Sequence, residues 1–132
     1  MKPLLCIAHR GGPLAGPSPL PENSLAAIAR ALTLGVYAVE IDVFQIHGEL
    51  FVTHDRRLGR VVSGQGIITA QSLAYLNAQH LENGEPLPRL QQVLELVGDK
   101  ALLNIEIKGE NTVPKLSQVL DDHIKSHQGS YE

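Results

Sequence analysis

The fold is decided by Tyr37-Ala38-Val39-Glu40-Ile41-Asp42-Val43-Phe44, a run in which apolar and acidic residues alternate. In a β-strand successive side chains point to opposite faces, so the run predicts a strand with two different faces. One face carries Val39, Ile41 and Val43 and suits packing beneath helices. The other carries Glu40 and Asp42, roughly 7 Å apart because two strand residues separate them.

The same alternation recurs in the predicted strand 101–108. Leu103, Ile105 and Ile107 form its apolar face, and Asn104, Glu106 and Lys108 form its polar face. Amphipathic strands of an antiparallel sheet, with the acids in solvent, are one interpretation. Parallel strands are usually covered on both faces, however, and buried carboxylates are costly unless a cation neutralises them. Three converging acids therefore favour a site for a divalent cation, Mg²⁺ or Ca²⁺, with Mn²⁺ as a further candidate.

Strand and helix signals alternate along the remainder of the chain. We predict short strands at 4–8 and 50–53, a Gly/Pro-rich loop at 11–21 and one helical turn at 72–76. Three helices are predicted: one capped by Asn23 or Ser24 and ended by Gly35, one from Pro88 to Gly98, and one from Thr112 with Val113, Leu116, Leu120 and Ile124 on one face. The tail 126–132 is expected to fray. Alternating elements of this kind predict an α/β fold with a mainly parallel sheet.

Composition limits the classes of function. The 132 residues carry a net charge of −3 with 4 % aromatics and no Trp, which argues against nucleic-acid binding. Cys6 is the only cysteine in the sequence, so no intrachain disulfide can form. No apolar run is long enough to span a bilayer, so no transmembrane segment is expected. The sequence favours a soluble, cytoplasmic domain.

Two histidines stand at predicted strand ends. His9 follows the first strand and His54 follows the third. A hairpin turning at 47–49 would pair residues whose numbers sum to about 96, which places Asp42 opposite His54. Two histidines beside a metal can divide general acid and general base roles near neutral pH.

Two cations and four further histidines complete the set of candidates. Arg10 and Lys108 would supply positive charge for a phosphate, or else act as ion-pair partners of the nearby acids. The remaining histidines are interpreted as surface or core residues; they are His47, His80, His123 and His127.

Five motifs in order resemble the signature of glycerophosphodiester phosphodiesterases. They are His9-Arg10-Gly11, Pro21-Glu22-Asn23-Ser24, Glu40-Ile41-Asp42, His54-Asp55 and Glu106-Ile107-Lys108. Weaker matches are Leu58-Gly59-Arg60, Gly64-Gln65-Gly66 and Pro88-Arg89-Leu90. The chain departs from the family pattern in its Pro-rich loop at 12–21, in His47-Gly48 replacing an Asp-Gly turn, and in Arg89 where Thr is commoner.

The resemblance implies a TIM-type β/α barrel that hydrolyses small-molecule glycerophosphodiesters to glycerol 3-phosphate and an alcohol. It implies a divalent cation bound by Glu40, Asp42 and Glu106, and His9 and His54 as the catalytic acid/base pair. Arg10, Lys108 and Asn23 would be the substrate- and phosphate-binding residues, with Asn23 also supporting its loop. Related toxins of the phospholipase D type and phosphoinositide-cleaving lipases share the barrel.

Length sets the chain apart from a whole barrel. An eight-stranded barrel typically needs about 250 residues, so residues 1–132 are expected to hold its N-terminal portion, about four strands with helices. Either the chain is part of a longer protein, or two copies associate as a homodimer that closes the barrel. The alternative function is a catalytically silent half-barrel that binds a cation or phosphate or assembles with a partner.

Overall fold

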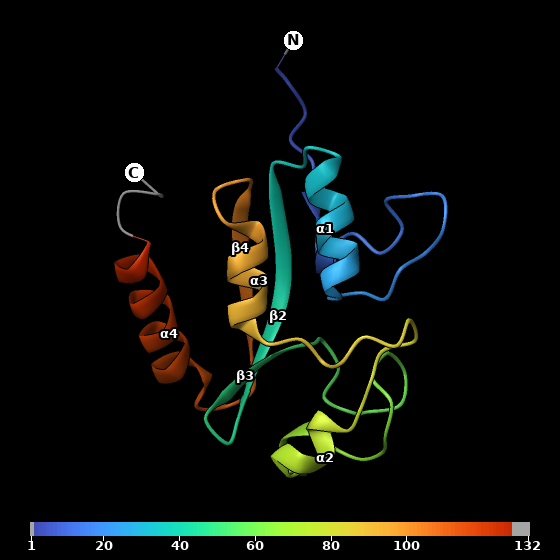
Figure 1. Ribbon diagram of the computed structural model, residues 1–132, viewed down its shortest axis with the longest axis vertical. Coiled ribbons are helices and arrows are strands. Elements are labelled where there is room, and N and C mark those ends of the chain that lie inside the picture. The colour runs from blue at the N-terminus through green and yellow to red at the C-terminus, as the bar shows by residue number, and fades with distance from the viewer. Residues whose placement is uncertain (1, 128–132) are drawn as a thin grey trace.

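The computed structural model describes residues 2–127, which form one sheet with helices (Figure 1). The four strands in this range are β1 (Ile7–Ala8), β2 (Ala38–Ile46), β3 (Glu49–Val52) and β4 (Leu102–Lys108). The α-helices are α1 (Leu25–Thr33), α2 (Leu73–Asn77), α3 (Leu90–Val97) and α4 (Thr112–Ser126), and short 3₁₀ turns lie at η1 (His9–Gly11) and η2 (Ile68–Ala70).

Strand β2 is the centre of the sheet. Strand β4 pairs with it in parallel along residues 38–44, and β1 pairs with it in parallel at residues 38–39. Strand β3 pairs antiparallel with residues 43–46 and therefore lies beyond β1 on the edge opposite β4. The parallel units β1–α1–β2 and β2–α3–β4 confirm the predicted α/β pattern.

The hairpin between β2 and β3 differs by one residue from the predicted register. Ile46 pairs with Glu49 and Val43 with Val52, so Asp42 lies opposite Thr53, whose N–H donates to the Asp42 carbonyl at 3.0 Å. The turn contains two residues, His47 (φ 51°) and Gly48 (φ 80°), both left-handed as a type I′ turn requires. The prediction was wrong because it assigned three residues to this turn.

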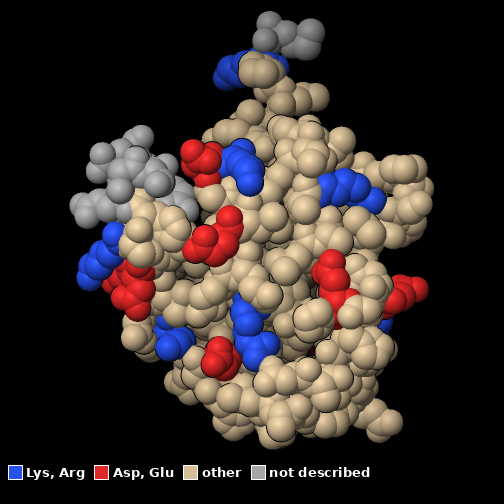
Figure 2. Space-filling view, in the orientation of Figure 1, with Lys and Arg blue, Asp and Glu red and all other residues tan. Residues whose placement is uncertain are grey.

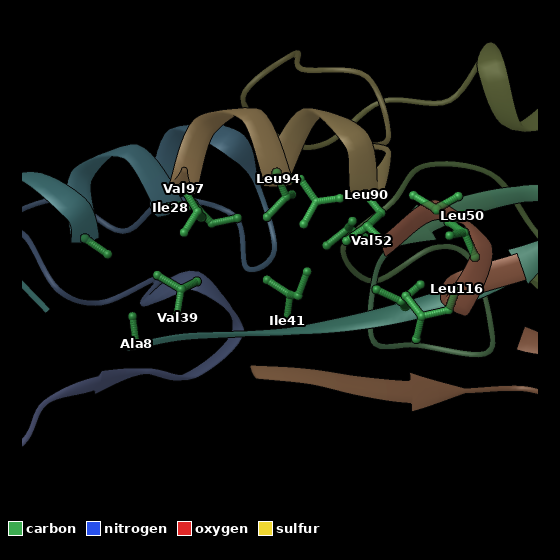
Figure 3. Packing of buried hydrophobic residues seen from close by; sticks show 14 of the residues in the cluster. Ala8, Ile28, Val39, Ile41, Leu50, Val52, Leu90, Leu94, Val97 and Leu116 are labelled. Carbon is green, nitrogen blue, oxygen red and sulfur yellow. The ribbon is translucent and has the colours of Figure 1, made fainter. Parts of the chain in front are cut away.

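The apolar face of β2 forms the main core under α1 and α3. Val39, Ile41 and Val43 have no exposed surface. Val39 and Ile41 point towards Ile28 of α1 and towards the apolar side chains of α3 (Figure 3). Complete burial of such a side chain contributes about 1.5–3 kcal/mol, so this face fixes the position of β2 firmly. The acid-bearing face is thereby directed away from the helices.

A second core covers the far end of the acid-bearing face. Phe44 and Ile46 follow Glu40 and Asp42 on that face and are 4 % and 3 % exposed. They pack against apolar side chains from β3 and from the segment between β3 and α3: Phe51, Val62, Ile68, Leu76, Leu81 and Leu87. The helical turn predicted at 72–76 lies in this segment as α2, with Ser72 accepting a hydrogen bond from the Tyr75 N–H. The segment thus closes one end of the polar face.

Two predicted element starts were wrong. The first strand is only Ile7–Ala8, and Leu4 is 99 % exposed, because β1 pairs with only the first residues of β2. The third helix begins at Leu90 instead of Pro88, since the Pro88 carbonyl accepts a hydrogen bond from the Val52 N–H and ties this residue to β3. Helix α1 starts at Leu25 with Ser24 as its cap, as predicted.

Helix α4 buries a stripe rotated from the predicted one, and the two stripes share Leu116 and the partly buried Leu120. Leu116 and Val119 are buried, whereas Val113 and Ile124 are 57 % and 55 % exposed. At about 100° per residue, the buried stripe is centred between Leu116 and Val119, and the two exposed residues lie roughly a quarter-turn to one side. The stripe continues into His123. The predicted frayed tail falls largely at 128–132, outside the described residues, and Ser126 is still helical.

The surface of the described chain carries charges of both signs. On the face seen in Figure 2, acidic and basic side chains are interspersed, and neither sign forms a continuous region. Within residues 2–127, none of the helices combines the length and apolar character needed to cross a membrane.

Candidate active site

Three carboxylates converge on the polar face of the sheet. Parallel pairing of β2 with β4 places Asp42 beside Glu106, and Glu40 lies two residues before Asp42 on the same face. One oxygen from each of the three carboxylates lies within 4.8 Å of the other two. Asp42 is fully buried and Glu40 is 7 % exposed, whereas the Glu106 side chain is 53 % exposed. The two carboxylates on β2 are therefore shielded from solvent, and the cluster is open to solvent at Glu106 on β4.

The chemistry of this cluster fits a hard divalent cation. Glu40 Oε1 and Asp42 Oδ1 are buried and accept no hydrogen bond from the described residues. Burial, followed by the charge of Asp42, raises the pKa of Glu40 above its usual range. Unpartnered buried carboxylate oxygens are costly, and an all-oxygen set at this spacing suits Mg²⁺, Ca²⁺ or Mn²⁺. Glu40, Asp42 and Glu106 could accordingly hold such an ion.

Asn23 fixes the carboxylate of Asp42. Its Nδ2 donates to Asp42 Oδ2 at 3.0 Å, and its Oδ1 accepts from the Asp42 backbone N–H at 3.4 Å. Asn23 is 1 % exposed and has a left-handed backbone (φ 59°), a conformation that Asn tolerates better than most residues. Its side chain therefore holds Asp42 in place, and the predicted contact of Asn23 with substrate stays a prediction.

His9 and Arg10 leave the sheet at the end of β1. Residues 9–11 form the tight turn η1, in which Arg10 has φ 51° and Gly11 has φ 77°. A Cβ on Gly11 would meet Ile28 Cγ1 at 3.0 Å, so glycine allows this turn to lie against α1. The turn directs His9 Nε2 to 3.5 Å from Glu40 Oε2, while the His9 side chain stays 70 % exposed. His9 thus reaches the carboxylate cluster from solvent.

His54 is oriented by a chain of charged side chains. Its Nδ1 lies 2.9 Å from Asp55 Oδ1, and Arg60 donates from Nε to Asp55 Oδ2 at 2.7 Å. The hydrogen bonds from Arg60 and then His54 lower the pKa of Asp55 to about 2. Arg60 also donates to Glu22, whose second oxygen accepts from Arg10 Nη1 at 2.8 Å. The network connects the two turns that carry His9 and His54.

A groove with a cationic rim opens beside His54. Its volume is about 1010 Å³, and its basic lining residues are His47, His54, Arg56, Arg57, Arg60 and Lys108. Lys108 Nζ lies 2.9 Å from Glu106 Oε1, and this hydrogen bond lowers the pKa of Glu106. His9 and Arg10 line a separate hollow of about 390 Å³. Positive charge along the larger groove is suited to an anionic phosphodiester.

The structure brings most of the predicted site residues together. His9 reaches Glu40, Asn23 reaches Asp42, and Lys108 reaches Glu106. Arg10 contacts Glu22 instead of one of the three cluster acids, which agrees with its ion-pair interpretation. No individual role was predicted for Glu22, Asp55 or Arg60. All three lie inside the motifs quoted above, and that position was the one available signal.

A partly parallel sheet with helices on one face and a cluster of carboxylates approached by a histidine on the other is the arrangement expected of part of a β/α-barrel domain. The chain matches the Glycerophosphoryl diester phosphodiesterase family over residues 9–130. It is 38 % identical to a glycerophosphodiester phosphodiesterase of Caldanaerobacter subterraneus subsp. tengcongensis, in an alignment covering 93 % of this chain and 53 % of the relative. The chain therefore belongs to the glycerophosphodiester phosphodiesterase family.

Solved structures agree with this assignment. A glycerophosphodiester phosphodiesterase from Agrobacterium tumefaciens superposes with a TM-score of 0.78 at 27 % identity, covering 89 % of this chain and 51 % of that one. A phosphodiesterase from Oleispira antarctica, in complex with sn-glycerol-3-phosphate, gives 0.74 at 28 % identity, covering 94 % and 53 %. The chain spans about half the length of the relatives it matches, and its fold is that of half a TIM-type barrel.

Proposed function

We propose that the chain carries the metal-dependent half of a glycerophosphodiester phosphodiesterase site and that residues 1–132 are a partial domain of this family. The reaction is hydrolysis of a glycerophosphodiester to glycerol 3-phosphate and an alcohol. The observation that carries the proposal is the buried pair Glu40 and Asp42, joined by Glu106 within 4.8 Å and approached by a histidine. The relatives' names and the glycerol 3-phosphate in the Oleispira antarctica structure support the substrate class.

Glu40, Asp42 and Glu106 would hold the divalent cation. Once bound there, a cation of this kind supplies polarisation of a phosphoryl oxygen and acidification of a nearby hydroxyl. Asn23 holds one Asp42 oxygen by a hydrogen bond of 3.0 Å, and the other, Oδ1, has no hydrogen-bond partner within residues 2–127. The side-chain amide therefore preorganises this carboxylate for its role as a ligand.

His9 and His54 act as the proton-transferring pair. Because the Asp55 carboxylate accepts a hydrogen bond, His54 carries a proton on Nδ1 in this arrangement. Its Nε2 is then the atom that accepts or donates a proton during the reaction. The mostly exposed His9 ring can turn its Nε2 from Glu40 to a substrate oxygen without disturbing the core. Each ring is thus free to transfer one proton, one to the leaving alcohol and one from the attacking hydroxyl.

Lys108 and the arginines of the groove bind the phosphodiester anion. Lys108 follows Glu106 by two residues on β4, so its ammonium group lies on the same face as the carboxylates. Arg10 and Arg60 both donate hydrogen bonds to Glu22, and these bonds hold together the loops on either side of the site.

The test is release of glycerol 3-phosphate from glycerophosphocholine by the purified chain with Mg²⁺, Ca²⁺ or Mn²⁺ and with chelator. We expect metal-dependent release that His54→Ala lowers by about 10²–10⁴-fold, as loss of an acid/base group does. His80→Ala is the matched control and should retain full turnover. Retained turnover in His54→Ala would refute its role, and release undiminished by chelator would refute the metal requirement.

The open strand edges favour a second arrangement. Within the described residues β4 pairs only with β2, and Leu102 and Ile107 on β4 are 57 % and 46 % exposed. We propose that a second copy can cover this edge, and light scattering across a concentration series tests it. A folded monomer that releases no product would instead support the silent half-barrel. A cytoplasmic location and a part in lipid and glycerol metabolism stay predictions.

A further inference from the structure

A second group of metal-ligating side chains lies away from the candidate active site, between α3 and α4. Glu95 of α3 faces His123 and His127 of α4, and their nearest ligand atoms all lie within 4.8 Å of one another. Glu95 Oε1 is 3.4 Å from His127 Nε2 and 3.8 Å from His123 Nδ1. Both helices belong to the helix-covered side of the sheet, whereas Glu40 and Asp42 point to the other side. The two clusters are therefore separate.

The geometry of helix α4 places both imidazoles on one stripe. Residues 123 and 127 are one helical turn apart and follow Leu116 and Val119 on the buried face. The two rings lie 4.2 Å apart between centroids with their planes inclined by 31°. The His123 side chain is 12 % exposed and that of His127 is 33 % exposed, so the edges of both rings are held against α3.

A contact with the backbone of its own helix orients the ring of His127. Its Nδ1 lies 2.9 Å from the carbonyl oxygen of His123. Nε2 is then the ring nitrogen that faces Glu95. Donation of the second ring nitrogen to a carbonyl is the arrangement that orients most metal-binding histidines. The orientation of the ring therefore directs Nε2 towards the carboxylate of Glu95.

We propose that Glu95, His123 and His127 form a zinc site that clips the end of α4 to α3. Two imidazole nitrogens and one carboxylate oxygen are a borderline set that suits Zn²⁺ or Co²⁺, unlike the all-oxygen cluster, which suits Mg²⁺ or Ca²⁺. Ligand atoms around a tetrahedral Zn²⁺ lie about 3.3 Å apart, given bonds of about 2.0–2.1 Å. The observed 3.4 and 3.8 Å come close to this spacing, and the three side chains would supply three of the four ligands.

The first experiment titrates the untagged chain with Zn²⁺ in excess Mg²⁺, which keeps the carboxylate cluster occupied. Long-range ¹H–¹⁵N spectra of the histidines follow the individual ring nitrogens. We expect the His127 Nε2 and His123 Nδ1 signals to shift together and to saturate at one Zn²⁺ per chain. Shifts confined to His9 and His54, or no shift of either α4 histidine, would overturn the proposal.

The second experiment compares variants by competition with a chromogenic chelator and by thermal unfolding. Glu95→Gln keeps the shape of a 65 % exposed side chain and so does not threaten the fold. Loss of this ligand should weaken Zn²⁺ binding at least about tenfold, the lower end of what even an outer-sphere change costs. His127→Ala should abolish the rise in Tm that Zn²⁺ produces in the parent chain, while His80→Ala should keep it. Equal Zn²⁺ affinity in the parent chain, Glu95→Gln and His127→Ala would show that the cluster is only a surface ion pair.

Discussion

Replacing Glu40 by Gln should stabilise the chain when metal is removed. Glu40 and Asp42 are 7 % and 0 % exposed, and carboxylate oxygens of the two lie within 4.8 Å of each other. At that separation two unit charges repel by about 0.9 kcal/mol in bulk water and about 3.5 kcal/mol at an effective dielectric constant of 20. Gln has nearly the same volume and can donate to a neighbouring carboxylate. We therefore expect a gain of about 1–3 kcal/mol.

Thermal unfolding in chelator measures this gain. An unfolding entropy of about 2.1 cal/mol/K per residue gives about 280 cal/mol/K for 132 residues, so the variant should melt about 4–10 °C higher than the parent chain. Saturating Mg²⁺ or Mn²⁺ should reverse the order of the two Tm values. At a hundredfold excess over Kd the parent chain gains about 2.7 kcal/mol from binding, whereas the variant has lost a ligand and gains little.

The matched control is Glu82→Gln, which removes the same charge from an exposed loop position. It should change Tm by no more than about a degree or two in either condition, because isolated surface charges contribute little. A Glu40→Gln chain that melts below its parent in chelator would refute the assignment of repulsion at this site. An unchanged response to metal would refute Glu40 as a ligand.

Three further predictions concern pH and packing. The pKa of Glu40 is raised, so its contribution to stability is present below about pH 4.5 and is lost as pH rises. In chelator, urea unfolding should therefore show the advantage of Glu40→Gln growing as pH rises above about 4.5. The pKa of Asp55 is lowered to about 2, so its carboxylate stabilises the folded chain at pH values above about 4. Asp55→Asn should lower the free energy of unfolding there by about 1–2 kcal/mol, after allowing for solvent screening. This difference from the parent chain should disappear as pH falls towards 2. Gly11→Ala and Gly35→Ala both place Ala at a left-handed φ, and each should lower the free energy of unfolding by about 1 kcal/mol. Gly11→Ala should lower it by about 1–3 kcal/mol more, because its Cβ would meet Ile28 at 3.0 Å, whereas nothing lies within 4 Å of a Cβ at Gly35. Equal losses in the two variants would refute the close approach of η1 to α1.

The strands and the acid cluster were predictable from the sequence because a period of two is a local property. Alternation at 39–43 identified β2, its buried face and the shared face of Glu40 and Asp42 without knowledge of any partner strand. Alternation at 103–107 did the same for Glu106. The parallel pairing of Asp42 with Glu106 then depended on βα connectivity, which the alternating elements also predicted.

Other features depend on contacts that no local pattern encodes. The hairpin register was missed by one residue because the number of residues in the turn follows from the left-handed backbone at His47 and Gly48. Arg60 contacts Glu22 across 38 positions of sequence, which a pass along the chain cannot predict. His123 and His127 were one helical turn apart in the sequence, but their partner Glu95 lies on another helix. Tertiary packing decides each of these.

The two faces of β2 divide stability and chemistry between them. Its apolar face has no exposed surface at Val39, Ile41 and Val43, and this burial offsets the cost of holding Glu40 and Asp42 together on the opposite face. Because adjacent residues share one backbone, a shift of the strand by one position would bury the acids under α1 and α3 and expose the valines. The same alternation that stabilises the core therefore fixes the backbone positions from which the two carboxylates point towards the polar face beside β4.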